Sequence, residues 1–204
     1  MKLYFSPGAC SLSPHIAFRE TGQSFDLIQV DTKTKKTKAG DDFLAVNPKG
    51  MVPVLVLDNG EVLTEGPAIV QYIADKKPGS LLPASGSTER YRVLEWLNYI
   101  TSEIHKAFTP MFKPNTPEDY KTISKDNLAT RFGYLHGKLA GKQFLTGDNY
   151  TVAVAYLFTV VNWSKFHNID IAKWPNLKAF MDRVAARPKV QEAMQAEGLL
   201  KAAA

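Results

Sequence analysis

Residues 48–66 read PKGMVPVLVLDNGEVLTEG, and the N-terminal half of the chain can be interpreted outward from them. Two apolar runs flank Asp58-Asn59-Gly60, and this combination predicts a β-hairpin with a tight turn. Pro53 precedes the first run, which keeps a residue without an N–H out of the centre of the ladder. An X-Pro bond at a tight turn is a place where a cis peptide occurs. A cis Val52–Pro53 bond would aim the N–H and C=O of Val52 outward, ready to pair with an extended peptide.

The same stretch ends at the predicted start of a helix. Residues 64–67, Thr-Glu-Gly-Pro, combine a polar cap, an acid and a proline in the first turn. The free N–H groups of a helix start bind carboxylates. We therefore expect a strand-like edge and an anion pocket side by side, which suits a small peptide with a free carboxylate.

The composition is that of an ordinary globular protein. Of 204 residues, 45% are hydrophobic and 22% are charged, and the net charge of +5 arises from 25 basic residues scattered among 20 acidic ones. This mixture favours a mildly basic soluble enzyme over a nucleic-acid-binding protein. No apolar run approaches the roughly 20 residues of a membrane span, and the N-terminus lacks a signal-peptide pattern. The single cysteine cannot form an intrachain disulfide, so we expect a cytoplasmic protein.

The N-terminal residues alternate between strand and helix patterns. Strands are predicted at residues 2–5 and 25–30, helices at 11–20, 41–46 and 65–75, and a lysine-rich loop at 32–40. A strand-helix-strand start followed by an antiparallel hairpin predicts a mixed sheet with helices on both faces. We assign residues 1–78 to this α/β domain.

A change of composition marks the second half. Residues 79–86 are rich in Pro, Gly and Ser, and we expect them to be a linker. After them only helical patterns follow, at residues 88–112, 118–139, 152–166, 175–186 and 188–198. The helix over 152–166 is apolar nearly all round, so it should be buried. We assign residues 87–204 to an all-α C-terminal domain.

Cys10 is the strongest candidate for chemistry. It follows a predicted strand and stands at a helix start, where N–H groups and the helix dipole favour a thiolate. The pattern Cys10-Ser11-Leu12-Ser13 has a serine where a redox pair carries its second cysteine, so oxidation would give a mixed disulfide with an outside thiol. The alternative is a buried, inert cysteine.

Other candidates have plausible structural roles. Tyr4 should pack from the first strand, and the hydroxyls of Ser11 and Ser13 are first-turn capping groups that could also donate to a thiolate.

Glu65 either stabilises its own helix or pairs with a ligand ammonium. The lysines at 32–40 either form an ordinary solvated loop or supply one lysine, Lys35, that would hold a ligand carboxylate. Within the helix over 88–112, three- and four-residue spacing places Asn98, Ser102 and His105 near one face. The four histidines show no ligand spacing, so no metal site is expected.

The whole chain resembles a glutathione transferase, most closely of the bacterial beta class. The resemblance is carried by MKLY at 1–4, PGACS at 7–11, NPKG at 47–50, VP at 52–53, LTEG at 63–66, AI at 68–69, EWLN at 95–98 and YLF at 156–158. It implies a thioredoxin-like N-terminal domain with a cis-proline and an all-helical C-terminal domain, in agreement with the patterns above.

The resemblance also implies a glutathione site. Val52 would pair its backbone with the cysteinyl part of the tripeptide, Glu65 and Gly66 would hold the γ-glutamyl end, and Lys35 would reach the glycyl carboxylate. Cys10 would lie near the glutathione sulfur. From the helical domain, the implied glutathione contacts are Asn98, Ser102, Glu103, Ile104, His105 and Lys106, with His105 as a catalytic group.

A homodimer and an apolar pocket are implied as well. Asn98 and Glu103 would come from the second subunit, because the family builds its site near the interface. The hydrophobic substrate would contact Phe108, Phe112 and Trp163, although each of the three also suits core packing.

Two positions depart from the family pattern. The buried helix usually begins with a capping box, Ser/Thr-x-x-Asp, but here Thr151 is followed by Val154, which predicts a stability cost of about 1 kcal/mol or more. Pro67 replaces an aliphatic residue and removes one N–H beside Gly66, which should weaken binding slightly.

Three functional hypotheses follow. The first is conjugation of the reduced glutathione thiol to small hydrophobic electrophiles, with glutathione as a co-substrate and no cofactor. The second is glutathione-dependent thiol–disulfide exchange or reductive dehalogenation through a Cys10 mixed disulfide. The third is a non-catalytic carrier of apolar ligands.

Overall fold

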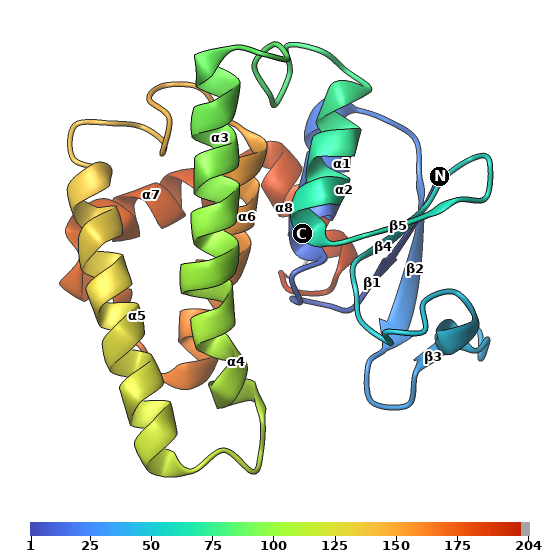
Figure 1. Ribbon diagram of the computed structural model, residues 1–204, viewed down its shortest axis with the longest axis horizontal. Helices are drawn as coiled ribbons and strands as arrows, with labels where there is room; N and C mark the ends of the chain where they lie inside the picture. Colours follow the sequence, from blue (N-terminus) through green and yellow to red (C-terminus); the bar gives the residue numbers. More distant parts are fainter. Residues whose placement is uncertain (201–204) are drawn as a thin grey trace. The chain divides into compact units, whose positions relative to one another are not determined.

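A computed structural model of the chain describes residues 1–200. These residues form two compact units, residues 1–83 together with 186–200, and residues 84–185. The first unit contains a β-sheet with its helices, and the second is built from helices (Figure 1).

The sheet of the first unit has five strands in the order β3-β2-β1-β4-β5. The strands are β1 (Lys2–Phe5), β2 (Asp26–Asp31), β3 (Lys36–Thr37), β4 (Val54–Val56) and β5 (Val62–Thr64). β1 pairs in parallel with β2 and antiparallel with β4, and β4 and β5 form the predicted hairpin. The mixed sheet predicted from the order of the elements is confirmed.

Helical segments cover both faces of this sheet, as predicted. They are α1 (Leu12–Thr21), the 3-10 helix η1 (Phe43–Ala45), α2 (Gly66–Asp75) and α8 (Pro188–Ala196). Phe43 of η1 packs with Val30 and Val54 in one buried cluster. Phe5 of β1 contacts His15 of α1, with 6.3 Å between the ring centroids, and α1 packs against α2. The unit is thioredoxin-like, and the sheet forms its middle layer.

Two features of this unit differ from the expectation. The lysine-rich segment at 32–40 contains the short edge strand β3, which pairs antiparallel with β2. The last helix, α8, packs against α1, and residues 186–200 therefore belong to the first unit, although they follow the helical domain in sequence.

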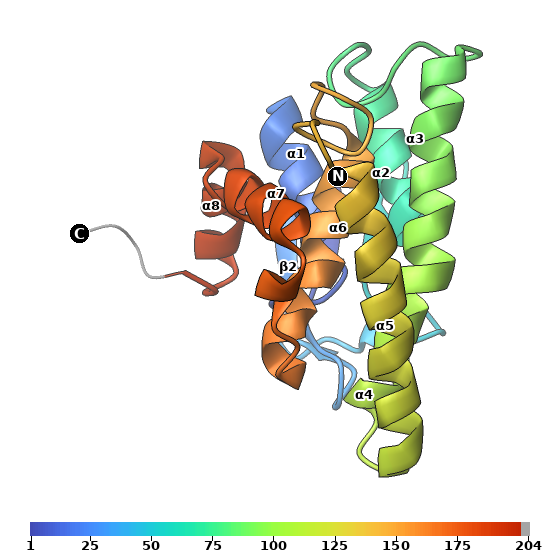
Figure 2. The same cartoon turned by 90° about the vertical axis from the view of Figure 1, so that its left-hand side faces the viewer.

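The second unit is entirely helical in the part that the structure describes, as predicted. Its elements are α3 (Thr88–Tyr99), the π-helix η2 (Ile100–His105), α4 (Lys106–Phe112), α5 (Glu118–Lys138), α6 (Val152–Val161), the 3-10 helices η3 (Asn162–His167) and η4 (Ile171–Lys173), and α7 (Pro175–Ala185). α3, η2 and α4 follow one another without a break, so the predicted helix over 88–112 is one rod with a π segment inside it. α5 runs beside η2 and α4 (Figure 2). Within residues 1–200, no helix has the length and apolar character that crossing a membrane requires.

Helix α6 is the centre of the helical unit. All ten of its residues, from Val152 to Val161, are buried, which confirms the prediction from its apolar composition. Thr151 stands at the N-cap, yet its side chain makes no capping hydrogen bond, and its buried Oγ1 has no hydrogen-bond partner among the described residues. Val154 is fully buried at the third position of the helix, where the carboxylate of a capping box would accept a hydrogen bond from the Thr151 N–H.

Candidate functional site

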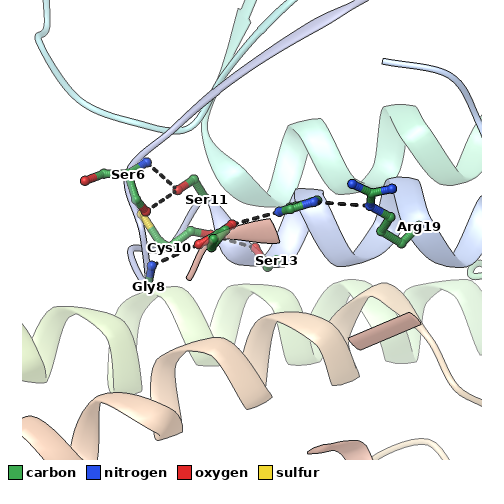
Figure 3. A network of polar contacts seen from close by, with 8 residues as sticks. Ser6, Gly8, Cys10, Ser11, Ser13 and Arg19 are labelled. Atoms are coloured by element: carbon green, nitrogen blue, oxygen red, sulfur yellow. Dashed lines mark hydrogen bonds and ion pairs between the residues drawn. The ribbon is translucent and has the colours of Figure 1, made fainter. Parts of the chain in front are cut away.

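Cys10 lies in the turn that connects β1 to α1, and nearby backbone and serine groups define this turn. The N–H of Ala9 donates to the carbonyl of Ser6 at 3.0 Å. The Ser11 hydroxyl accepts from the Ser6 N–H and donates to the Ser6 carbonyl, both at 3.2 Å (Figure 3). The Ser13 hydroxyl donates to the Cys10 carbonyl at 2.9 Å. Both hydroxyls are thus bonded to groups of the turn itself. Ser11 was expected to cap α1, but its side chain makes no capping hydrogen bond.

The Cys10 thiol is half-buried and donates a hydrogen bond to the carbonyl oxygen of Val52, 3.3 Å away. Burial raises the pKa of this thiol to about 12. The N–H groups of Cys10 and Ser11 lower the pKa, but by less, and the carboxylate of Glu65 raises it further. The predicted thiolate is therefore wrong for the free protein, because desolvation outweighs the N–H groups of the turn.

Sequence reasoning missed a second layer behind this turn, which comes from the C-terminal residues. Glu197 Oε2 accepts a hydrogen bond from the Gly8 N–H at 2.9 Å, and Glu197 Oε1 lies 2.9 Å from His15 Nδ1. The side chains of His15 and Glu197 are both 0% exposed. The Arg19 Nε–H donates to His15 Nε2 at 3.3 Å, so the His15 proton lies on Nδ1 and is donated to Glu197. This network fixes the turn that carries Cys10.

The Val52–Pro53 bond is cis, as expected, and it immediately precedes β4. Asn47 holds the preceding loop together. Its side-chain N–H donates to the Met51 carbonyl at 2.8 Å, and its Oδ1 accepts from the Lys49 N–H at 3.2 Å. Val52 therefore stands at the end of a loop whose shape is set by a buried side chain.

Lys35 is held against the same loop. It has a positive φ of 59°, and its Nζ donates to the Gly50 carbonyl at 2.8 Å. Gly50 has a φ of 62°, and a Cβ there would lie 3.1 Å from Leu44 and 3.2 Å from Lys35. The absence of a side chain at Gly50 thus leaves room for the Lys35 side chain to cross the loop. The Lys35 ammonium, which was expected to hold a carboxylate, is bonded to a residue two positions before Val52.

Glu65 precedes α2 with an unusual backbone. Its φ of 70° and ψ of 113° lie outside the regions that ordinary residues favour, and its side chain does not cap the helix. The carboxylate instead pairs with Lys49 at 2.7 Å. Gly66 is the first residue of α2, and Pro67 follows it. A Cβ added at Gly66 would lie 3.8 Å from Cγ of Pro53, which is an ordinary contact distance. In the first unit the structure thus brings Cys10, Val52 and Glu65 into one neighbourhood.

The predicted helical-unit residues lie on more than one face of the rod. Asn98, Ser102 and Lys106 are exposed at four-residue intervals. His105 instead turns inward, where Nδ1 lies 2.7 Å from the hydroxyl of Tyr156 on α6. The prediction that His105 shares the face of Asn98 and Ser102 is therefore wrong, because η2 is a π-helix and shifts the angular position of the residues in it.

Two further residues of η2 are engaged within their own chain. Glu103 Oε2 accepts hydrogen bonds from both Nε and Nη2 of Arg131 on α5, at 3.1 and 2.9 Å. Ile104 is fully buried. Glu103, a predicted glutathione contact, is thus in an ion pair with Arg131. Ile104, another predicted glutathione contact, lies in the core.

The three aromatic candidates for a hydrophobic substrate do form one cluster. The ring of Trp163 on η3 lies 5.6 Å from Phe108 and 5.2 Å from Phe112, both edge-on. It also lies 4.8 Å from the His105 ring. Phe108 and Trp163 are buried, whereas Phe112 is exposed, so Phe112 is the member of the cluster that is open to solvent. Within residues 1–200, no group of His, Cys, Asp or Glu side chains is arranged to hold a metal ion.

Comparison with family models gives two matches along the chain. Residues 8–76 match the model described as glutathione S-transferase, N-terminal domain, and residues 99–188 match glutathione S-transferase, C-terminal domain.

Individual relatives cover nearly the entire chain. Glutathione S-transferase GstA of Escherichia coli O157:H7 is 48% identical, over 98% of this chain and 100% of the relative. A sphingomonad glutathione S-transferase complexed with glutathione is 48% identical, with a TM-score of 0.94 over 98% of this chain and 100% of the other. The bacterial beta class glutathione S-transferase of Sphingomonas chungbukensis is likewise 48% identical, with a TM-score of 0.95 and the same coverage.

Proposed function

Because the chain belongs to the glutathione S-transferase family, and is close to its bacterial beta class, we propose that it conjugates reduced glutathione to small hydrophobic electrophiles. Detoxification is the general role of this family. Glutathione is the co-substrate, and the conjugation chemistry needs no separate cofactor. The observation that supports this most strongly is the Cys10 thiol, 3.3 Å from the carbonyl of Val52 beside the cis Val52–Pro53 bond.

The tripeptide lies extended along Val52. Its cysteinyl N–H and C=O pair with the backbone of Val52 by strand addition. The glycyl carboxylate meets the Lys35 ammonium, which is bonded to Gly50 in the free protein. The γ-glutamyl end meets the carboxylate of Glu65 and the start of α2 at Gly66, where Pro67 removes one donor. This pose brings the glutathione sulfur to the turn that holds Cys10.

Cys10 assists as a hydrogen-bond donor. Since burial keeps its thiol protonated, the S–H can leave the Val52 carbonyl, which then accepts from the tripeptide, and donate to the glutathione sulfur. A donor to the charged form lowers the pKa of the glutathione thiol, which increases the population of thiolate. The thiolate attacks an electrophilic carbon, a C–S bond forms, and the leaving group departs with its electron pair. His105 and Lys106 approach the same sulfur from the helical domain. The electrophile is bordered by Phe112, Trp163 and Phe108.

The pH dependence of conjugation in Cys10→Ala and Cys10→Ser tests this role. If Cys10 donates to the sulfur, the apparent pKa of bound glutathione rises in Cys10→Ala and returns toward the wild-type value in Cys10→Ser, while conjugation persists at high pH. An unchanged pH profile in Cys10→Ala rules out the donor role.

Thiol–disulfide exchange is the second hypothesis, and the protonation of Cys10 weighs against it as the main activity. A thiol with a pKa of about 12 is almost wholly protonated at neutral pH, whereas exchange needs the thiolate. Mass spectrometry after incubation with oxidised glutathione separates the hypotheses. A rapid 1:1 mixed disulfide at Cys10 at neutral pH favours exchange. If neither activity is found but apolar dyes bind, the carrier hypothesis gains.

The quaternary state and location belong to the same proposal. The protein forms a cytoplasmic homodimer in which Asn98 and Glu103 approach the site of the second subunit. Asn98 is exposed, as this requires, and Glu103 is oriented by Arg131. Light scattering coupled to gel filtration measures the mass, and a monomer at working concentration contradicts the dimer.

A further inference from the structure

We propose that Lys49 occupies, in the free protein, the place on Glu65 that the α-ammonium of the γ-glutamyl group takes, and that ligand binding displaces Lys49. The inference rests on the proposed function, since it assumes that Glu65 receives the ammonium of glutathione. It adds a residue that sets affinity for ligands carrying a primary ammonium.

Two acceptor atoms bind the Lys49 ammonium, and we call the position between them the ammonium seat. Its Nζ lies 2.7 Å from Glu65 Oε1 and 2.8 Å from the Thr64 hydroxyl. These are the short distances of charge-assisted hydrogen bonds. A lysine ammonium and the α-ammonium of a γ-glutamyl group are chemically alike, each with three donors and one positive charge. A pair of acceptors that holds one therefore suits the other.

The position of Lys49 is set by its loop. Its N–H donates to Oδ1 of the buried Asn47 at 3.2 Å, and the same Asn47 side chain donates to the Met51 carbonyl at 2.8 Å. The main chain at Lys49 is thus fixed by a local turn, so the side chain has a short, constant distance to span to reach Glu65.

The carboxylate of Glu65 is available for such a partner because it does not serve its own helix. Glu65 stands at the N-cap of α2 without a side-chain capping bond and with a positive φ of 70°. A non-glycine residue in this region is held there by its surroundings and occurs preferentially at binding sites. This backbone directs the Glu65 side chain toward the ammonium seat, which Glu65 forms together with Thr64, instead of toward the first turn of α2.

The Lys49–Glu65 pair is weak enough to be displaced. The side chains of Lys49 and Glu65 are 46% and 72% exposed, and exposed ion pairs contribute little net free energy. Competition therefore lowers affinity modestly. Removing the competitor should tighten glutathione binding by about two- to fivefold.

The direction of this effect distinguishes competition from general electrostatics. Glutathione carries a net negative charge at neutral pH, so removing any lysine near the site weakens its long-range attraction. Lys38→Met is the matched control, because it removes the same charge from an exposed position of the neighbouring lysine-rich segment. Competition predicts tighter binding for Lys49→Met, and general attraction predicts weaker binding for both variants.

Calorimetric titration with glutathione and with its analogue that lacks the α-amino group tests the proposal. Lys49→Met should bind glutathione more tightly than the wild type, and Lys49→Gln should do the same. Neither variant should gain affinity for the des-amino analogue, since that ligand has no ammonium to compete. Equal or weaker glutathione binding by folded Lys49→Met overturns the proposal, and so does an equal gain for both ligands.

Glu65→Gln separates this proposal from the function on which it rests. If Glu65→Gln leaves glutathione affinity unchanged, the assignment of Glu65 to the ligand ammonium fails, and the Lys49 proposal fails with it. If Glu65→Gln weakens binding while Lys49→Met does not strengthen it, the glutathione site stands and only the competition is wrong.

Discussion

Glu197 accepts a hydrogen bond from the backbone N–H of Gly8 at 2.9 Å, across 189 positions of the chain. The same carboxylate pairs with the buried His15. The turn that presents Cys10 is thus held from behind by a residue at the opposite end of the sequence. A stability measurement can test how much of the unit depends on this contact.

Glu197→Ala removes a buried carboxylate and leaves His15 and the Gly8 N–H without it. The substitution removes two hydrogen bonds to this carboxylate, and losing one partner of such a bond typically costs about 1–3 kcal/mol, so we expect a loss of about 2–5 kcal/mol in the free energy of unfolding. Urea denaturation measures it. Glu192→Ala, which removes an exposed ion pair with Lys189 on the same helix, is the control and should change stability by less than about 1 kcal/mol. Equal losses in both variants contradict the structural role of Glu197.

Val154→Asp should stabilise the protein, because it supplies the missing half of the capping box at α6. An aspartate there can accept hydrogen bonds from the Thr151 N–H and from its buried hydroxyl, which has no partner among the described residues. We expect a gain of about 1 kcal/mol, or an increase of roughly 2–4 °C in melting temperature. The gain should shrink in the Thr151→Ala background. An unchanged or lower melting temperature contradicts the prediction.

Alkylation of Cys10 should be slow at neutral pH and should accelerate steadily as the pH rises. The pKa of the thiol is raised from 9.0 to about 12, so the protonated form persists above the pH at which an ordinary cysteine ionises, and only the thiolate reacts. Iodoacetamide labelling followed by intact mass, from pH 7 to 10, measures this, with the urea-unfolded chain as the control. A labelling rate that levels off below pH 8 shows that Cys10 is a thiolate after all.

Gly50→Ala should displace Lys35 and weaken glutathione binding. Its Cβ would lie 3.1 Å from Leu44 and 3.2 Å from Lys35, on a backbone with a φ of 62°. Gly60→Ala is the matched control, because Gly60 also has a positive φ, 85°, but an added Cβ meets nothing within 4 Å. Both variants should lose about 1 kcal/mol of stability from backbone strain, and only Gly50→Ala should lose affinity in calorimetry. Unaltered binding in Gly50→Ala shows that Lys35 does not depend on this glycine.

Local patterns made much of this architecture predictable. The Asp58-Asn59-Gly60 turn, the helix start after Glu65 and the buried α6 each depend on residues close together in sequence, and the structure has them where expected. The π segment within the rod was not predictable in this way. It keeps an ordinary amphipathic pattern, yet it moves His105 off the face of Asn98.

Properties that depend on tertiary contacts could not be read from the sequence. The pKa of Cys10 follows from how deeply it is buried, which helix-start reasoning does not include. The partner of His15 lies 182 positions away. The one available signal was His15 itself, an ionisable residue just before the apolar run 16–18 of α1, since such a group requires a partner when it is buried. The contact of Lys49 with Glu65 likewise depends on the hairpin β4–β5, which brings together residues 16 positions apart.

The crystal structure of a glutathione complex tests the central claim most directly. We predict that the cysteinyl residue of the tripeptide pairs through its N–H and C=O with the backbone of Val52, that its sulfur lies within hydrogen-bonding distance of Cys10 Sγ, and that its α-ammonium contacts Glu65. A tripeptide bound away from Val52, or one whose sulfur lies out of reach of Cys10, contradicts the account.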